Sequence, residues 1–142
     1  KKAIDVVIDQ VNGRVKVVAG TGASGTAQAL EMTKYAKDAG ADAALVVTPF
    51  YLKPTDRGIY EHFDTLASQV DLPIILYNIP QVTGLSLPWQ MVEDLAQIPN
   101  IVGVKDSSGQ LSFILAVLEK VRDKINVLCG HDEVVLAGLA AG

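Results

Sequence analysis

The chain has 142 residues, of which 49% are hydrophobic and 20% are charged, and its formal net charge is −4. This composition is typical of a globular protein and excludes a disordered one. The 12 basic residues are scattered along the chain among 16 acidic ones, which argues against nucleic acid as a partner.

Cysteine content and hydropathy indicate the setting in which the chain works. The single cysteine, Cys129, cannot build a disulfide framework, which fits a reducing compartment. No apolar run approaches the roughly 20 residues that a bilayer span needs, and no charged segment followed by an apolar one opens the chain. We therefore expect a cytoplasmic protein with no membrane partner.

Both ends of the sequence resemble interrupted helices. The first residues, KKAIDVVIDQV, carry apolar residues at helical spacing and are followed by Gly13 as a stop signal. The last residues, EVVLAGLAAG, have the pattern of another helix. Because the chain also begins without methionine, we expect it to be a piece of a longer protein.

Between these ends, five short runs rich in β-branched residues alternate with amphipathic stretches. The predicted strands are residues 15–20, 43–48, 73–78, 101–106 and 125–130. The predicted helices are residues 25–39, 56–70, 87–97, 111–122 and 133–142. Ser24 or Thr26 is the expected start signal of the first of these helices, and Thr55 that of the second. The near-continuously apolar strands predict an α/β protein with a parallel sheet.

The spacing of the strand ends narrows the fold further. The predicted strands end 25 to 29 residues apart, at Gly20, Thr48, Tyr77, Lys105 and Gly130. A (β/α)₈ barrel of roughly 250 residues uses about 30 residues for each unit, so five units fill this chain and three are missing. The period favours a partial TIM barrel over residues 1–142 as a single domain. A doubly wound open sheet has a similar spacing and stays an alternative.

A glycine-rich stretch, GTGASG, follows the first predicted strand. Gly20, Gly22 and Gly25 have the spacing of a dinucleotide-binding fingerprint, which would indicate a nicotinamide-dependent oxidoreductase. Such a site also needs an acidic residue at the end of the next strand, but the nearest acid, Asp42, precedes that strand. The stretch is therefore predicted to be a tight strand-to-helix turn, with phosphate or nucleotide binding as the alternative.

Reactive groups of a barrel come from the carboxyl ends of its strands, where one lysine stands out. Lys105 ends the apolar run IVGV, and Gly103 two residues earlier leaves room beneath it. A lysine at the mouth of an apolar interior can become a neutral amine that attacks a ketone to form a Schiff base. A structural ion pair of Lys105 with Asp106 or Asp132 is the alternative.

A tyrosine at the matching position of the preceding strand supports the reactive interpretation. If Tyr77 and Lys105 both point inward, they lie on neighbouring strands roughly 5 Å apart. A phenol beside an imine can transfer protons to the carbinolamine and to the substrate. Alternatively, Tyr77 is a rim aromatic whose hydroxyl finds another partner.

Five motifs appear together in this chain, in a fixed order: GTGAS, VVTPFYLKPTDRGIYEHF, PIILYNIPQVTG, PNIVGVKDSSG and CGHDEVVLAGLAAG. In order and spacing they resemble the dihydrodipicolinate synthase / N-acetylneuraminate lyase superfamily of pyruvate-dependent class I aldolases. The resemblance implies a (β/α)₈ barrel, of which this chain is expected to form strands three to seven. The family loop similar to GTTGE, which holds the substrate carboxylate, would precede residue 1.

The resemblance also implies roles for individual residues. Lys105 falls on the lysine that forms the Schiff base, and Tyr77 on the tyrosine of the proton relay. Tyr51 falls on a second tyrosine that reaches into the relay of the neighbouring subunit, within a dimer of dimers. A loop aromatic that packs at an interface is the alternative for Tyr51.

Two features bear on the substrate that the resemblance implies. The synthase branch usually carries an arginine for a substrate carboxylate where this chain has Val82, which lacks the forked donor that a carboxylate needs. Conversely, GHDE resembles a segment with which sugar-acid lyases bind substrate hydroxyls. The expected substrate-binding residues are Ser107, Gly130, Asp132 and Glu133. Acids favoured at a helix N-terminus are the alternative for the last two.

Together these features predict a Schiff-base lyase or aldolase that acts on pyruvate or another 2-oxo acid and an aldehyde, similar to dihydrodipicolinate synthase. No metal and no organic cofactor is expected. The alternatives are a 2-keto-3-deoxy sugar acid aldolase or N-acetylneuraminate lyase-type enzyme, and a non-catalytic 2-oxo acid sensor.

Overall fold

The computed structural model describes residues 1–142, in which helices and strands alternate along the chain. The helices are α1 (Lys2–Val11), α2 (Thr26–Ala39), α3 (Asp56–Gln69), α4 (Pro80–Thr83), α5 (Trp89–Leu95), α6 (Leu111–Val121), the 3₁₀ helix η1 (Asp132–Val134) and α7 (Val135–Ala141). The strands are β1 (Val18–Gly20), β2 (Ala43–Val47), β3 (Ile74–Asn78), β4 (Ile101–Asp106) and β5 (Asn126–Cys129).

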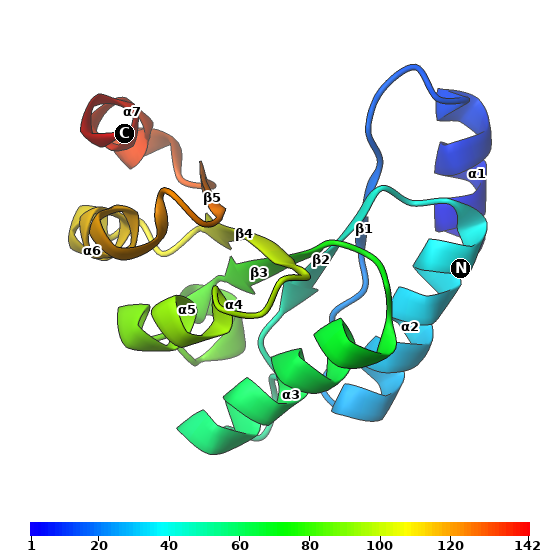
Figure 1. Cartoon of the computed structure of the whole chain (residues 1–142), viewed down its shortest axis with the longest axis horizontal. Coiled ribbons are helices and arrows are strands. Elements are labelled where there is room, and N and C mark those ends of the chain that lie inside the picture. The colour runs from blue at the N-terminus through cyan, green and yellow to red at the C-terminus, as the bar shows by residue number, and fades with distance from the viewer.

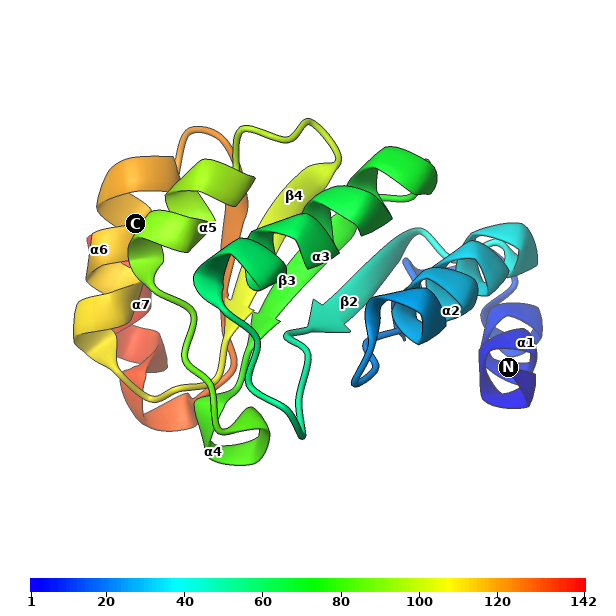
Figure 2. The same cartoon turned by 90° about the horizontal axis from the view of Figure 1, so that it is seen from below.

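The five strands form one parallel sheet in the order β1-β2-β3-β4-β5. The sheet is curved, and the helices lie along the outside of the curve, with α1 and α7 at its two ends (Figure 1). Seen from the side of the helices, α3 lies over the middle strands, and α5 lies between α3 and α6 (Figure 2). The predicted α/β class and parallel sheet are confirmed, and the sheet stays open because β1 and β5 do not meet.

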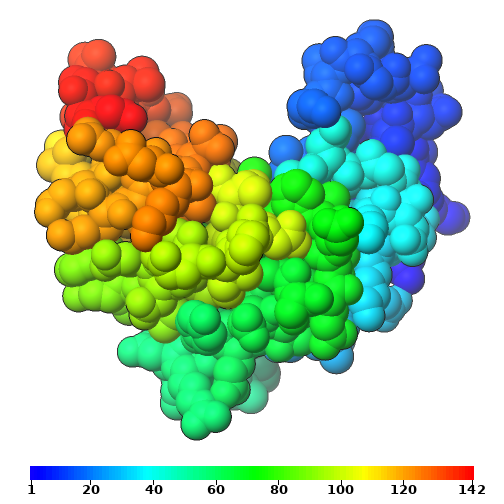
Figure 3. Space-filling model, in the orientation of Figure 1, coloured from blue at the N-terminus to red at the C-terminus, as the bar shows by residue number.

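The core lies between the sheet and the helices. Strand residues that face the helices are fully buried, namely Ala44, Val46, Ile74, Leu76 and Val104. Residues that alternate with them are only partly covered, and at the edges Val18 and Leu128 are 47% and 42% exposed. The space-filling view shows the open notch between the two ends of the molecule (Figure 3). The concave face of the sheet is therefore accessible.

Several predicted boundaries differ from the structure. β1 begins at Val18 rather than at residue 15, and the Val17 amide donates to the Asp42 carboxylate instead of entering the ladder. The helix predicted over residues 87–97 corresponds to the shorter α5, Trp89–Leu95. The short helix α4, which was not predicted, precedes it. Residues 133–142 divide into η1 and α7.

Two helix starts show how local sequence sets boundaries. The Thr55 hydroxyl accepts a hydrogen bond from the Gly58 amide at 3.2 Å, so the predicted cap of α3 is confirmed. Neither Ser24 nor Thr26 caps α2. The N-cap residue is Gly25, which has no side chain to accept a hydrogen bond from the first turn. None of the helices is both long and apolar enough to cross a membrane.

Candidate active site

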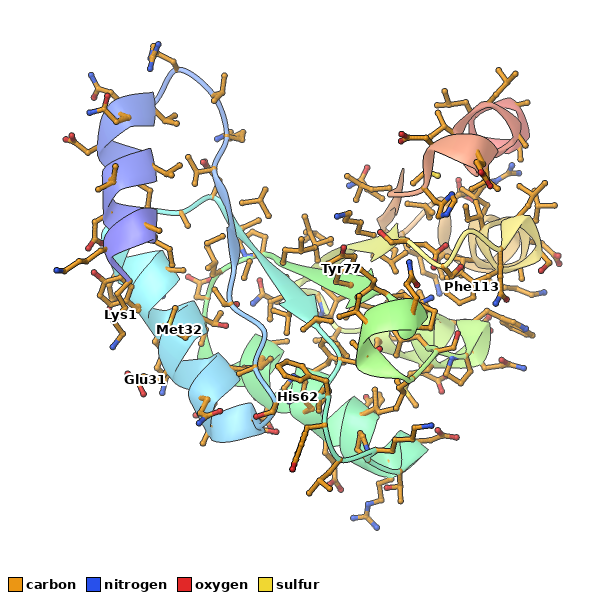
Figure 4. The ribbon with its side chains drawn as sticks, turned by 180° about the vertical axis from the view of Figure 1, so that it is seen from behind. Lys1, Glu31, Met32, His62, Tyr77 and Phe113 are labelled. Atoms are coloured by element: carbon orange, nitrogen blue, oxygen red, sulfur yellow. The ribbon has the colours of Figure 1, made fainter.

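The predicted lysine and tyrosine meet at the carboxyl ends of two adjacent strands. Tyr77 of β3 is directly paired with Lys105 of β4, as their common phase predicted. The Lys105 Nζ atom lies 4.2 Å from the centre of the Tyr77 ring, within the range of a cation–π contact. Tyr77 lies near the middle of the sheet, at the base of the notch (Figure 4). Both side chains are half-buried on the concave face.

The surroundings of Tyr77 make its phenol more acidic than usual. Hydrogen bonding with the Ser107 hydroxyl lowers the pKa of the Tyr77 phenol below its ordinary value of 10.0. Hydrogen bonding with Lys105 and its positive charge lower this pKa further, whereas burial raises it. Stabilising the phenolate in this way suits a group that exchanges protons with a bound substrate.

Gly130, after the end of β5, packs directly against this pair. A Cβ atom at Gly130 would lie 2.8 Å from the Lys105 Cε atom and 3.2 Å from the Asp106 carbonyl oxygen, and it would overlap the Ser107 Oγ atom. The Gly130 amide donates to the same carbonyl oxygen at 2.7 Å. The structure thus brings Gly130 and Ser107 together with Lys105 and Tyr77.

Behind Lys105 and Tyr77, on the face of the sheet covered by helices, lies a buried polar pair. The Asn78 Nδ2 atom donates to the Asp106 Oδ1 atom at 2.6 Å, and both residues are fully buried. The other Asp106 oxygen accepts from the Ser108 hydroxyl at 2.8 Å and from the Ser108 amide at 3.3 Å. Sequence reasoning assigned this pair no role in the site, although these polar residues directly follow Tyr77 and Lys105 at the ends of apolar strands.

These contacts bear on the alternative in which Lys105 forms a structural ion pair. Lys105 takes part in none of the ion pairs of the chain, and the Asp106 carboxylate is occupied by Asn78 and Ser108. An ion pair of Lys105 with Asp106 or Asp132 is therefore wrong. The amine faces the Tyr77 ring and the accessible notch instead.

The segment after Gly130 lies at the same edge of the sheet without touching the reactive pair. Asp132 and Glu133 are exposed, form no side-chain hydrogen bond and occupy the first turn of η1. Between them and Gly130, the His131 ring packs on Gly109, where a Cβ atom would come within 3.1 Å of it. His131 therefore joins the loops after β4 and β5, and sequence reasoning gave it no role.

Tyr51, in the loop after β2, and Val82, in α4 after β3, are two further positions that the sequence singled out. Tyr51 is 92% exposed, has a left-handed backbone with φ of 78°, and is not part of the Lys105 cluster. Val82 of α4 is 74% exposed. The aliphatic part of Lys53 comes close to α4, because its Cε atom lies 3.7 Å from the position of a Cβ atom at Gly84.

The glycine-rich stretch has a packing role at one of its three positions. A Cβ atom at Gly22 would lie 2.6 Å from the Val47 Cγ1 atom and 2.7 Å from the Val47 amide nitrogen. At Gly20 and Gly25 such an atom would meet nothing within 4 Å, and neither glycine has a positive φ. The prediction of a tight turn therefore rests on Gly22, which lets the turn approach β2.

Metal-binding residues do not gather anywhere in the chain. No group of three or more histidine, cysteine, aspartate or glutamate side chains lies close enough together to hold a metal ion.

Comparison with known proteins assigns the chain to a family. The family model described as "Dihydrodipicolinate synthetase family" matches residues 1–142. The chain belongs to this family. It is 48% identical over 141 residues to the 4-hydroxy-tetrahydrodipicolinate synthase of Geotalea daltonii, covering 99% of this chain and 49% of that protein. The corresponding protein of Methanothrix thermoacetophila is 46% identical over 143 residues, covering 100% of this chain and 48% of that protein.

A solved structure of the family has the same fold over this region. The chloride-inhibited dihydrodipicolinate synthase of Acinetobacter baumannii in complex with pyruvate matches with a TM-score of 0.96 and 45% identity, over 99% of this chain and 48% of that chain. The chain spans about half the length of the dihydrodipicolinate synthetase family members that it matches. The predicted family is confirmed, and this open sheet corresponds to about half of such a protein.

Proposed function

We propose that the complete protein containing this chain is a lyase that forms a Schiff base between Lys105 and pyruvate or another 2-oxo acid. The observation that carries the proposal is the pairing of Lys105 with Tyr77 across β3 and β4, at 4.2 Å from Nζ to the ring centre. We also propose a complete (β/α)₈ barrel with this chain as strands three to seven. The family relationship supports both statements.

In the proposed reaction, the neutral amine of Lys105 attacks the keto carbon, and the carbinolamine loses water to give the imine. The Tyr77 phenol delivers the proton with which the hydroxyl leaves as water. The Tyr77 phenolate takes a proton from the neighbouring carbon to give an enamine. The enamine attacks the aldehyde carbonyl, which forms the new carbon–carbon bond and restores the imine, and the aldehyde oxygen takes up the proton from Tyr77. Hydrolysis of the product imine restores Lys105. The imine serves as the electron sink, so the reaction requires no metal and no organic cofactor.

The first candidate for the overall activity is that of a 4-hydroxy-tetrahydrodipicolinate synthase, the name of relatives 46% to 48% identical to this chain. Ser107, Gly130, Asp132 and Glu133 are proposed substrate-binding residues. Ser107 and Gly130 have the stronger support, because both adjoin Lys105.

A second candidate is an aldolase for 2-keto-3-deoxy sugar acids or an N-acetylneuraminate lyase-type enzyme. The observation that favours it is the apolar and exposed Val82, where a cation would serve a carboxylate-bearing aldehyde. The exposed carboxylates of Asp132 and Glu133 suit sugar hydroxyls, to which they can accept hydrogen bonds. Rates of the complete protein with pyruvate and aspartate semialdehyde, N-acetylmannosamine or glyceraldehyde distinguish the two candidates.

We also propose that the complete protein is a cytoplasmic homo-oligomer, a dimer of dimers, with Tyr51 at a subunit interface. An aromatic side chain that is 92% exposed on a loop supports this role. Light scattering of the complete protein and of Tyr51→Ala measures it, and the variant is expected to dissociate into smaller species.

Borohydride reduction tests the Schiff base directly. The complete protein treated with pyruvate and borohydride should carry one adduct, on the peptide that contains Lys105. Lys105→Arg should abolish the adduct, whereas the control Lys124→Arg, at an exposed residue, should retain it. Tyr77→Phe should still form the adduct, but more slowly, and should lose about 100-fold or more in turnover.

Other outcomes of this experiment contradict the proposal. An adduct on another lysine, or none at all, would exclude Lys105 as the nucleophile. Thermal stabilisation by pyruvate without any product from the aldehydes would identify a non-catalytic 2-oxo acid sensor.

A further inference from the structure

The ladder between β3 and β4 contains one extra residue. Ile74 of β3 pairs with Ile101, but the next residue of β3 pairs with Gly103. Val102 is therefore left without a partner on β3, which is the arrangement of a β-bulge. The pairing of the two strands changes at this point by one residue.

This change of register decides which β4 side chain faces Tyr77. With the bulge, Tyr77 pairs with Lys105. If the pairing before the bulge continued, Val104 would lie opposite Tyr77 instead. Because successive strand residues point to opposite faces, Lys105 would then turn toward the helices. The reactive pair can form only in the bulged register.

A buried hydrogen-bonded pair lies directly after the bulged segment. Asn78 and Asp106 are register partners, and the Asn78 amide donates to the Asp106 carboxylate at 2.6 Å. The Asn78 Oδ1 atom accepts from the Leu87 amide at 3.0 Å, and Ser108 donates twice to the second carboxylate oxygen. Each side-chain oxygen of the pair is thus matched with a donor, and the bond between Asn78 and Asp106 joins the two strands in this register.

We propose that Asn78 and Asp106 are positioning residues that hold β3 and β4 in the bulged register, so that Lys105 and Tyr77 face each other. This inference rests on the proposed function, which assigns those two residues to the chemistry. Buried polar pairs contribute little net stability compared with apolar side chains of similar size, but a mismatched pair is costly. A one-residue slip would separate the Asn78 amide from its acceptor and leave a buried carboxylate short of donors.

Backbone hydrogen bonds extend this arrangement to the rest of the site. The Ser107 amide donates to the Asn78 carbonyl oxygen at 2.9 Å, and the Gly130 amide donates to the Asp106 carbonyl oxygen at 2.7 Å. The Gln81 side chain donates to the Ser107 carbonyl oxygen at 2.6 Å. A shift of the Asn78–Asp106 pair would therefore move Ser107 and Gly130 together with the reactive residues.

The test uses two single variants and an exchange in the complete protein. Asp106→Asn leaves a single side-chain oxygen, which can accept from Asn78 or from Ser108 but not from both. The exchange Asn78→Asp with Asp106→Asn restores every hydrogen bond with the polarity reversed. Ser108→Ala removes one donor only and is expected to fold. Thr33→Val is the matched control, because it breaks the buried Thr21–Thr33 hydrogen bond of 2.8 Å away from the site.

The first readout is the rate of imine formation with pyruvate, measured by borohydride trapping. Asp106→Asn is expected to slow trapping at Lys105 by about 10-fold or more, because small displacements of reacting groups reduce rates strongly. Ser108→Ala should give a smaller loss, and the exchange should return the rate to within about threefold of the unaltered protein. Thr33→Val should lower the melting temperature and leave the trapping rate within about twofold.

The second readout does not depend on pyruvate. The pKa of Tyr77 is obtained from the difference between the ultraviolet titration of each protein and that of the same protein carrying Tyr77→Phe. This pKa should rise in Asp106→Asn and stay unchanged in Thr33→Val. If the unaltered protein formed no adduct at Lys105, the proposed function would fail, while this titration would still test the positioning. Unchanged trapping and an unchanged Tyr77 pKa in folded Asp106→Asn or Ser108→Ala would overturn the inference. Equal losses in Thr33→Val would also overturn it.

Discussion

The Lys105 Nζ atom lies over the Tyr77 ring, at 4.2 Å from its centre, and the two residues are partners in the β3–β4 ladder. This arrangement places the proposed nucleophile, Lys105, and the proposed proton carrier, Tyr77, side by side at the edge of the sheet where ligands of parallel sheets bind. Ser107 and Gly130 complete the immediate surroundings. The following predictions test these contacts one at a time.

Ser107→Ala is expected to raise the pKa of Tyr77 toward its ordinary value of 10.0. The Ser107 hydroxyl is the strongest of the groups that lower this pKa, because its hydrogen bond stabilises the phenolate. The difference between ultraviolet titrations with and without Tyr77→Phe, recorded for the unaltered protein and for Ser107→Ala, measures the change in the pKa of Tyr77. Ser112→Ala, on the exposed surface of α6, is the control and should leave the titration unchanged. An unaltered pKa in Ser107→Ala would refute the contact.

Gly130→Ala is expected to reduce turnover by about 100-fold, because the added Cβ atom would displace Lys105 and Ser107. The melting temperature should change little, since Gly130 is exposed and lies outside the helices and strands. Gly20→Ala, at the end of β1, is the matched control because its Cβ atom would meet nothing within 4 Å. Full activity of Gly130→Ala would show that the site tolerates a displaced lysine.

Gly22→Ala is expected to destabilise the protein by about 1–3 kcal/mol, the usual cost of overpacking. The cause is the approach of the new Cβ atom to Val47, at 2.6 Å from its Cγ1 atom. Gly25→Ala is expected to leave the free energy of unfolding nearly unchanged. Urea unfolding measures both. Fluorescence enhancement of a reduced nicotinamide cofactor, lost in Gly22→Ala, would instead support the dinucleotide interpretation.

Acid is expected to destabilise the protein through His62. Burial between α2 and α3 lowers the pKa of His62 from 6.5 to about 4, while its Nδ1 atom lies 2.9 Å from the Thr26 hydroxyl. The unfolded chain therefore takes up this proton at a higher pH than the folded protein. Stability is fully present above about pH 6.5 and is lost as the pH falls toward 4, by about 2 kcal/mol at pH 5.

Urea unfolding at pH 7 and pH 5 measures this loss. His62→Gln keeps a polar side chain but cannot titrate, so its stability should fall less over the same interval. Tyr60→Phe, on the exposed side of α3, should keep the pH dependence of the unaltered protein. Parallel pH profiles of His62→Gln and the unaltered protein would contradict the assignment.

Local sequence patterns determined the five strands of this protein, the longer helices between them and their order. Apolar runs predicted all five strands, and the separation of 28 positions from Tyr77 to Lys105 predicted neighbours with a common phase. These predictions succeeded because strand formation and the repeat of a βα unit depend on residues close together in the chain. The Thr55 cap was predictable for the same reason.

Tertiary structure alone decided how the strands align and what surrounds the reactive pair. The bulge at Val102, the Asn78–Asp106 hydrogen bond and the contact of Gly22 with Val47 each join residues from different units. No local pattern encodes them, because register between strands depends on which side chains satisfy one another after packing. The sequence by itself placed a lysine and a tyrosine at two strand ends. The packed sheet decided that they face each other.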